Sequence, residues 1–511
     1  MSNLLDKASI ILTPTAYDNS KVLCVKPSDG SGDFDFSRNS AATRVNAQGL
    51  VENVQTISGN LLDYSTFTSP SASWSLVGGL WVFDDTANGY ILTPNIAVVV
   101  GDVFNVVIDV TIASGNANFR YASGNAQTVL FPFTDFVDGV NEFQATITGV
   151  DGNLERIFAP ASLTDNPFTL NSISIKKITD DTNLPRINYE GFSYDGSGNI
   201  IPNSGCGSWL WEPQSTNLIP YSEDFTQSNW IKHAAVVLTS GQLSPDGGNN
   251  AYKVQGTIGS SFLLDGGFSA ITPQSRSIYM RADTNGVIYT LGDSQSNQIN
   301  VTTEWQRFEL QEVSNSFYAV DFRGSGVTLD TVYIWGTQLE EQSYATSYIP
   351  TDGSSVTRNQ DLCTNGGSLA TINSTEGVLY AEIAALANDG TTRFVGLNDG
   401  SNSNRVVIVY YSVSNRIRAI VSSGGTKYVD VNYQLTNILD FHKVAIKYKL
   451  NDFALWIDGV KVATDTTLNA PIGLDRLDFL LSGANNFFGK TKAVAVFPYL
   501  SDAELTELTT I

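Results

Sequence analysis

The stretch at residues 205–230 reads GCGSWLWEPQSTNLIPYSEDFTQSNW and lies near the middle of the 511-residue chain. One block of short apolar runs ends before it, and a second block begins after it. The stretch thus marks a boundary between two blocks of short strands. The stretch therefore determines how the rest of the chain divides.

An internal repeat links this stretch to an earlier part of the chain. Both copies carry the pattern Asn-Leu-aliphatic-any-Tyr-Ser, followed by a Phe and then a Trp, over residues 60–74 and 217–230. A repeat of this kind predicts two similar domains in tandem. If Trp74 and Trp230 hold equivalent positions, both indoles should be buried.

The composition indicates an ordered all-β protein of several domains. A chain of 511 residues predicts about three or four domains. Aromatic residues make up 11% of the chain, whereas disordered chains are poor in them. Charged residues make up only 16%, against roughly 25% in an average domain, and long surface helices need more charge than this.

The charge balance excludes several classes of partner. A net charge of −22 repels phosphate backbones and anionic lipid, so we expect no nucleic acid as a partner. No apolar run is long enough to span a bilayer, and the N-terminus lacks a signal-peptide pattern, so we expect no membrane insertion. Folding in a cytosol follows. The three cysteines, Cys24, Cys206 and Cys363, are far apart and are expected to be free thiols.

The spacing of apolar runs predicts the domain boundaries. Runs about ten residues apart with turn residues between them indicate β-sandwiches or jelly rolls. We expect an N-terminal arm with a short hairpin at 1–58, a first sandwich at 59–179, a connector at 180–215, a second sandwich at 216–345, a linker at 346–368 and a third sandwich at 369–511. Ser501 and Glu504 form a capping box that predicts a helix near the C-terminus.

Several long, ordered strings resemble a module that is common in phage virion proteins, including tail fibres, tail-tip proteins and head decorations. The strings are FSRNSAATRVN at 36–46, LPRINY at 184–189, WEPQSTNL at 211–218, YSEDF at 221–225, QLEE at 338–341, YATSYIPT at 344–351 and VTR at 356–358. The resemblance covers roughly residues 30 to 365. The C-terminal part is similar, more loosely, to concanavalin A-like and laminin-G-like sandwiches.

This resemblance implies a place in a virion rather than a reaction. It implies two jelly-roll-like sandwiches, a concanavalin-like third sandwich, and an N-terminal arm that attaches to other virion proteins. It also implies a homotrimer of the tail-fibre or head-fibre type, exposed on the phage particle after synthesis in the host cytoplasm. Adhesion to a bacterial surface glycan is the expected role of the distal domain.

Catalysis is poorly supported by the sequence. Concanavalin-like glycosidases often carry Glu-x-Asp-x-Glu on one strand to flank the sugar bond, and no such string occurs here. The chain also lacks Gly-x-Ser-x-Gly, and its two histidines, His233 and His442, fall in separate predicted domains. We therefore expect no enzyme. A polysaccharide depolymerase and a purely architectural subunit without ligand remain the alternatives.

The candidate glycan site lies in the third sandwich. Sugar sites combine an aromatic platform with Asn or Asp side chains that bind hydroxyl groups. The candidate residues are Asn398, Asp399, Asn402, Asn404, Tyr411 and Tyr428. The same loop is equally explained as an ordinary Asn/Ser/Gly turn.

No cofactor is expected, but a structural calcium ion is an open alternative. Acidic turns at 29–35, Asp180, Asp181 and Asp195 carry the oxygen ligands that calcium prefers. None has the spacing of an EF-hand, and solvated turns explain them equally well.

Overall fold

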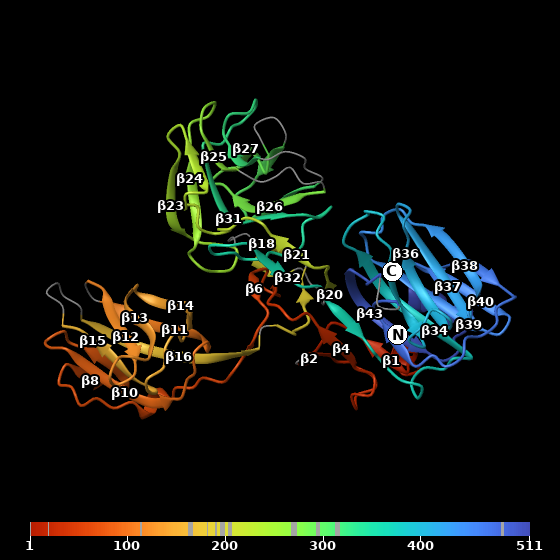
Figure 1. Ribbon diagram of the computed structural model, residues 1–511, viewed down its shortest axis with the longest axis horizontal. Coiled ribbons are helices and arrows are strands. Elements are labelled where there is room, and N and C mark those ends of the chain that lie inside the picture. Colours follow the sequence, from red (N-terminus) through yellow and green to blue (C-terminus); the bar gives the residue numbers. More distant parts are fainter. Residues whose placement is uncertain are drawn as a thin grey trace. The chain divides into compact units, whose positions relative to one another are not determined.

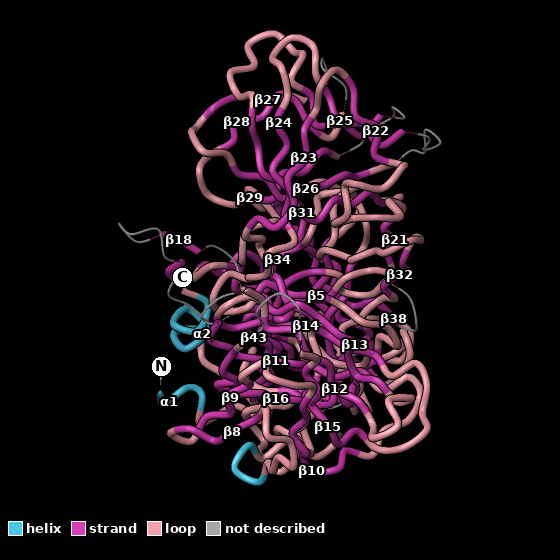
Figure 2. The backbone as a smooth tube through the Cα atoms, turned by 90° about the vertical axis from the view of Figure 1, so that its left-hand side faces the viewer, coloured by secondary structure: helices cyan, strands magenta, loops and turns pink. Residues whose placement is uncertain are grey.

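The computed structural model describes residues 2–18, 20–112, 115–161, 167–180, 182–189, 192–194, 200–202, 207–266, 273–292, 297–311, 317–481 and 485–510. Cys206, Asp181 and Asp195 lie outside these residues. The chain forms two compact units, one of residues 55–181 and a larger one of residues 1–54 and 182–511. Strands dominate both units (Figures 1 and 2), so the all-β prediction is confirmed.

The smaller unit is the first sandwich. One sheet has the order β10 (Gly89–Ile96), β15 (Leu154–Ala159), β12 (Ala117–Ala122), β13 (Val129–Phe136). The other has the order β14 (Gly139–Thr146), β11 (Val103–Ile112), β16 (Phe168–Asp180), β9 (Leu80–Phe83), β8 (Trp74–Val77), and β7 (Thr56–Ile57) adds to β16. A short 3-10 helix, η1 (Tyr64–Thr66), precedes β8. Buried residues alternate along β11 and pack between the two sheets, as a period of two requires.

The second sandwich lies in the larger unit. One sheet has the order β22 (Trp230–His233), β25 (Phe262–Gly266), β30 (Phe317–Asp321), β27 (Gly286–Thr290), β28 (Gln298–Val301). The other has the order β23 (Val237–Gln242), β24 (Ala251–Gln255), β31 (Thr331–Glu340), β26 (Ser275–Arg281), β29 (Gln306–Leu310). A core that includes Val254, Ile278, Val320 and Ile334 fills the space between the sheets.

The third sandwich carries the longest sheet. Its order is β17 (Ile187–Asn188), β20 (Ser208–Trp211), β43 (Gly489–Phe497), β34 (Glu376–Ala385), β39 (His442–Lys449), β40 (Asp452–Ile457), β41 (Val460–Asp465), with β1 (Ile10–Leu12) on β43. The opposite sheet has the order β38 (Thr426–Gln434), β37 (Arg416–Ser423), β36 (Arg405–Tyr410), β35 (Arg393–Asn398), β42 (Arg476–Asp478). Helix α2 (Asp502–Thr509) follows, and the capping box of Ser501 and Glu504 is confirmed.

The tandem repeat is confirmed in the topology of the first two sandwiches. Strands β8 to β16 correspond one by one to β23 to β31, because the two pairs of sheets have the same strand order. The side chain of Asn60 accepts a hydrogen bond from the Ile175 backbone in the last strand of its sandwich, and Asn217 accepts one from Leu339 in the same way. The repeated motif therefore joins the start of each sandwich to its last strand.

The two tryptophans match the prediction only in part. Trp74 is 4% exposed and Trp230 is 2% exposed, so the predicted burial is confirmed. Their positions are not equivalent, however. Trp74 lies in β8, whereas Trp230 lies in β22, an additional strand of the opposite sheet that has no counterpart among the described residues of the first sandwich.

The N-terminal segment is packed against the third sandwich, and its attachment role stays a prediction. Helix α1 (Ser2–Leu5) leads into β1, which is fully buried and pairs with β43. Leu4, Ala8 and Ile11 pack with Trp456 and Leu505 on the outer face of the third sandwich. The three consecutive apolar residues Ile10 to Leu12 are buried on both faces of the sheet. This burial holds the N-terminal segment against the third sandwich.

Short strands of the N-terminal segment, connector and linker pair with one another, and we call this region the junction. It contains a sheet of β2 (Tyr17–Asp18), β3 (Lys21–Val22), β4 (Phe34–Ser37) and β33 (Leu362–Thr364), together with β5 (Thr43–Val45) on β6 (Val51–Asn53) and β21 (Ser215–Asn217) on β32 (Val356–Arg358). A separate hairpin joins β18 (Phe192–Tyr194) and β19 (Ile200–Pro202). Cys24 and Cys363 are buried free thiols here, as predicted.

A buried ion-pair network holds the junction together. Arg186 pairs with Glu212 at 2.6 Å and with Asp361, and Arg358 pairs with Glu212 at 2.8 Å. Arg38 pairs with Asp361 at 3.1 Å. All five side chains are at most 4% exposed, so each charge depends on its partners for stabilisation.

The network also determines the ionisation of its members. Burial alone raises the pKa of Glu212, but the charges of Arg358 and Arg186 and hydrogen bonds from Ser347 together hold that pKa well below its usual value. Burial lowers the pKa of Arg38 to about 10, against the opposing effect of Asp361. Glu212 is therefore ionised throughout the ordinary pH range.

Replacing Asn217 by Ala tests the repeated motif. The fully buried amide of Asn217 donates to Thr337 and Ile349 and accepts from Ile219 and Leu339. We expect a loss of about 3 kcal/mol, because several backbone groups lose their partners, and only about 1 kcal/mol for Asn60→Ala, where the side chain is exposed. Hydrogen exchange of the backbone amides in β31 and β16 measures the stability of each sandwich separately. Equal losses of stability in the two variants would contradict the expected difference.

Replacing Glu212 by Gln tests the network. We expect a loss of about 3 to 5 kcal/mol at pH 7, because Arg186 and Arg358 lose their buried counter-charge. Since the folded pKa of Glu212 is depressed, its stabilisation is fully present above the unfolded pKa of about 4.3 and decreases as the pH falls below that value. Urea denaturation from pH 7 to 3 checks this, with the exposed pair Glu376–Lys449 as control. A Glu376→Gln change should cost less than about 1 kcal/mol.

Candidate functional site

A groove of about 1130 Å³ runs along the outer face of the second sandwich. Its floor comes from β26 and β29, and its walls come from the β5–β6 hairpin, the loop at 243–247 and the segment at 344–348. All of these elements belong to the larger unit. Ligand pockets commonly enclose about 300 to 1,000 Å³, so the groove is large enough for several sugar rings.

Aromatic side chains form the floor of the groove. Tyr279 packs edge-on against Trp335 with ring centroids 5.3 Å apart, and Trp335 packs against Tyr348 at 4.6 Å. Burial raises the pKa of Tyr279 and also that of Tyr348, where Glu223 adds to the effect. Tyr279 remains partly exposed, so one ring of this cluster faces the groove.

Trp305 and Arg281 lie side by side at the edge of this floor. The guanidinium carbon of Arg281 is 5.6 Å from the Trp305 ring centroid and 3.8 Å from that of Tyr333. Trp305 is partly exposed. Partly exposed aromatic rings offer apolar faces to the C–H groups of a sugar, while a neighbouring cation is available for a polar substituent.

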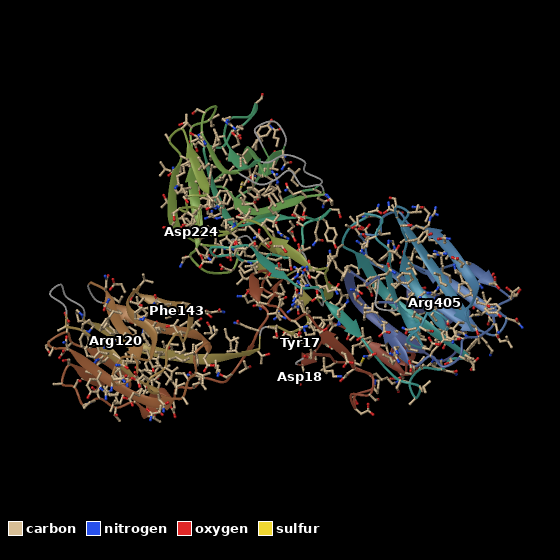
Figure 3. All side chains as sticks on the ribbon, in the orientation of Figure 1. Tyr17, Asp18, Arg120, Phe143, Asp224 and Arg405 are labelled. Carbon is tan, nitrogen blue, oxygen red and sulfur yellow. The ribbon has the colours of Figure 1, made fainter. Side chains whose placement is uncertain are left out.

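Two further arginines in the groove are neutralised within the protein. Arg44 contacts Glu52 at 2.8 Å and donates to the hydroxyl of Tyr17, which is labelled in Figure 3. Arg307 pairs with Glu309 at 3.4 Å and donates to Ser277 at 2.8 Å and to the Thr346 carbonyl at 2.7 Å. These contacts fix the walls of the groove rather than offering charge to a ligand.

Polar groups surround the aromatic floor. Several of them can donate to or accept from sugar hydroxyls, and those on the groove surface are Asn285, Thr302, Thr303, Glu304, Gln306 and Glu309. An apolar floor with a few convergent polar groups is typical of small-molecule sites. The geometry therefore suits a neutral or acidic oligosaccharide.

The sequence carries a signal for this groove in residues outside the predicted glycan site. The strand alternation places Ile278 and Met280 in the core, which leaves Tyr279 and Arg281 on the outer face. Trp305 precedes β29 on the same side. An aromatic and basic outer face on two adjacent strands is the pattern that points to a ligand surface.

The predicted loop of the third sandwich is held by its own hydrogen bonds. Asn398 is 3% exposed and donates to Asp478 at 2.9 Å. Asp399 accepts from Ser401 and from Asn404. Burial raises the pKa of Asp399, and these hydrogen bonds more than reverse that effect. The side chains therefore act mainly as turn-formers.

Asn402 lies in the same loop as Asn398, Asp399 and Asn404, whereas the two predicted tyrosines have other neighbours. Asn402 is exposed and accepts from Arg405, which is labelled in Figure 3. Tyr411 follows the far end of β36, about 20 Å along the strand from Arg405 at roughly 3.3 Å per residue, and stacks with Arg418. Tyr428 packs against the core of the sandwich. No shared platform results, and sugar binding at this loop remains a prediction.

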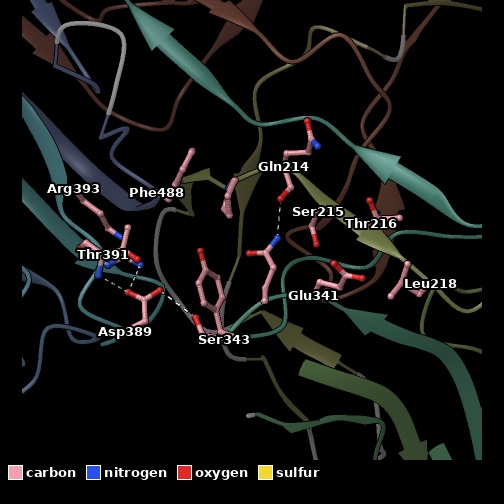
Figure 4. Close-up of a pocket in the computed structure, with 13 residues that line it drawn as sticks. Gln214, Ser215, Thr216, Leu218, Glu341, Ser343, Asp389, Thr391, Arg393 and Phe488 are labelled. Atoms are coloured by element: carbon pink, nitrogen blue, oxygen red, sulfur yellow. Dashed lines mark hydrogen bonds and ion pairs between the residues drawn. The ribbon is translucent and has the colours of Figure 1, made fainter. Parts of the chain in front are cut away.

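A smaller pocket of about 550 Å³ lies beside β21 and the turn at 341–344 (Figure 4). Arg393 pairs with Asp389 at 2.9 Å, and Ser343 donates to the same carboxylate. Gln342 donates to the Gln214 carbonyl across the pocket. These groups satisfy one another, so the pocket is better explained as a contact between the second and third sandwiches.

The groove is lined by the carboxylates of Glu212, Glu304 and Glu309. Glu212 reaches its inner wall but has a depressed pKa and is bound by two arginines, so it cannot serve as a general acid. In the ranges that the structure describes, no three His, Cys, Asp or Glu side chains are grouped to hold a metal ion. The turn carboxylates Asp29, Asp33 and Asp35 bind Ser31, the Cys24 amide and Lys21.

Comparisons with known proteins give partial likenesses only. No protein family and no curated protein matches the chain. Part of the chain is similar to the CBM40 domain of Ruminococcus gnavus IT-sialidase bound to alpha2,3 sialyllactose, with 17% identity, 27% of this chain and 83% of that chain covered, and a TM-score of 0.24. A second similar structure is Domain 4 of AbnA, a GH43 extracellular arabinanase from Geobacillus stearothermophilus, in complex with arabinotriose. The match has 11% identity, covers 30% of this chain and 73% of that chain, and has a TM-score of 0.26.

A tandem likeness spans more of the chain. The CBM22-1-CBM22-2 tandem domain of Paenibacillus barcinonensis Xyn10C has 12% identity, covers 57% of this chain and all of that chain, and has a TM-score of 0.17. Scores this low carry no conclusion about ligand or function.

Within the described part of the chain, no helix has the length and apolar character needed to cross a bilayer.

Proposed function

We propose that the protein is a non-enzymatic component of a bacteriophage virion that binds a host-surface glycan through the groove of its second sandwich. The single observation that carries the glycan proposal is the groove itself. It combines the partly exposed rings of Tyr279 and Trp305 with surrounding hydroxyl, amide and carboxylate groups. This combination matches the chemistry of a sugar, which has apolar C–H faces and polar edges.

The groove replaces the third-sandwich loop as the preferred site. Most side chains of that loop are engaged in turn hydrogen bonds. In the groove, by contrast, Asn285 and Thr303 are exposed, and Trp305 presents part of its ring. A glycan can therefore reach free groups without first breaking contacts within the protein.

Support for a virion role comes from the sequence strings that resemble phage fibre and head-decoration proteins. Arg38, Arg186, Glu212 and Arg358, which belong to those strings, meet in the buried network. Those strings thus specify one folded module. We propose that the protein is exposed on the phage particle as a homotrimer bound to other virion proteins. Because residues 4–12 pack on the third sandwich, their attachment role would require a different surface.

Two other roles stay as outcomes of the test. A depolymerase would cleave the polysaccharide that it binds, and an architectural subunit would bind no glycan. The depressed pKa of Glu212 argues against acid catalysis by the groove carboxylate nearest to the network. Release of reducing ends from host polysaccharide would favour the depolymerase.

Replacing Trp305 by Ala tests the proposal. We expect labelled full-length protein to bind host cells saturably, and the variant to bind about 5- to 30-fold more weakly, because the sugar loses an aromatic face worth about 1 to 2 kcal/mol. Tyr433→Ala removes an exposed ring in β38, outside the groove, and should bind like the wild type. Thermal unfolding checks that both variants fold.

The outcomes separate the three roles. Binding without cleavage that depends on Trp305 supports the proposal. Equal binding by the wild type and the folded Trp305 variant would place the glycan site elsewhere, with the third-sandwich loop tested next by Asn402→Ala. Absence of binding by full-length protein would favour an architectural subunit.

A further inference from the structure

Arg281 is a cation in the groove that has no acidic partner among the described residues. Its guanidinium lies against Tyr333 and near Trp305. Among the residues described, no carboxylate lies within ion-pair distance of it, and it donates no hydrogen bond. The chain holds 51 acidic and 29 basic residues, so a shortage of acids does not explain this arrangement.

The neighbouring cations are different. Arg44 is bound by Glu52, and Arg307 by Ser277, Thr346 and Glu309. Lys490, which also lines the groove, has a partner as well. Arg281 thus stands out among the groove cations as the one whose charge is available to a ligand.

The stacking of Arg281 prepares it for a planar anion. At 3.8 Å from the Tyr333 ring centroid, the guanidinium contacts the face of the ring. Such a contact restrains the side chain and leaves the N–H groups along the guanidinium edge free to donate. Two of these groups match the two oxygens of a carboxylate.

We propose that the groove recognises a carboxylate-bearing glycan, such as a uronic-acid polysaccharide, with Arg281 bound to the carboxylate and Trp305 packed against the sugar ring. This inference rests on the proposed glycan binding and names its substrate class. The net charge of −22 repels an acidic polymer elsewhere on the protein. Recognition therefore depends on this local positive site.

The first sandwich offers a matched control variant that tests whether Arg281 has a purely structural role. Arg120, labelled in Figure 3, lies 4.6 Å from the Phe133 ring centroid and 5.2 Å from that of Phe158. It likewise has no acidic partner among the described residues. Arg120→Gln therefore removes a stacked, unpaired arginine without touching the groove.

The experiment measures binding of full-length protein to two immobilised acidic probes, polygalacturonate and polyglucuronate oligomers, each beside its carboxyl-reduced neutral form. We expect the acidic forms to bind at least 10-fold more tightly. Arg281→Gln should weaken binding to the acidic forms by about 10- to 100-fold, as loss of a charged hydrogen-bond pair predicts. Arg281→Lys should recover part of this loss, and Arg120→Gln should change nothing.

Each outcome decides the inference. Equal binding of acidic and neutral forms, or no effect of Arg281→Gln, overturns the role of the carboxylate while glycan binding itself stands. Equal weakening of both forms by Arg281→Gln assigns the arginine a structural role and also overturns the inference. If none of these probes binds but host cells do so through Trp305, the substrate class is wrong and the proposed function survives. If host cells also fail to bind, the proposed function fails.

Discussion

The buried ion pairs of Arg38, Arg186, Arg358, Glu212 and Asp361 are the constraint on which the larger unit depends. Five charges without access to water are stable only when all their partners are in place. They come from the N-terminal segment, the connector and the linker, so these segments must meet. The groove depends on the same network, because Arg186 also donates to the Thr43 carbonyl and Thr43 donates to that of Tyr348.

The two tandem sandwiches have similar interiors but different outer faces. Strand β26 of the second sandwich corresponds to β11 of the first, and both bury alternate apolar residues. On the outer face, β26 carries Tyr279 and Arg281, whereas β11 carries Asn105, Val107 and Asp109. The repeat thus preserves what folds the sandwich, while the exposed positions are free to differ in function.

Much of the fold was predictable from local pattern. The repeated Asn-Leu motif and the capping box at Ser501 each reflect short-range chemistry, and each was confirmed. The candidate site was not predictable in the same way. The loop at 398–404 has the composition of a sugar site, but its Asn and Asp side chains serve the turn, which composition alone cannot distinguish.

The sequence by itself determined the all-β class, the tandem sandwiches and the C-terminal helix, because period, turns and caps depend on neighbours within a few residues. Only the tertiary structure decided that the N-terminal segment is packed against the third sandwich, that Trp74 and Trp230 occupy different sheets, and that Arg281 lies beside Trp305 and Tyr333. These contacts join residues far apart in the chain. They are selected by burial and charge pairing across the whole unit, which no local pattern encodes.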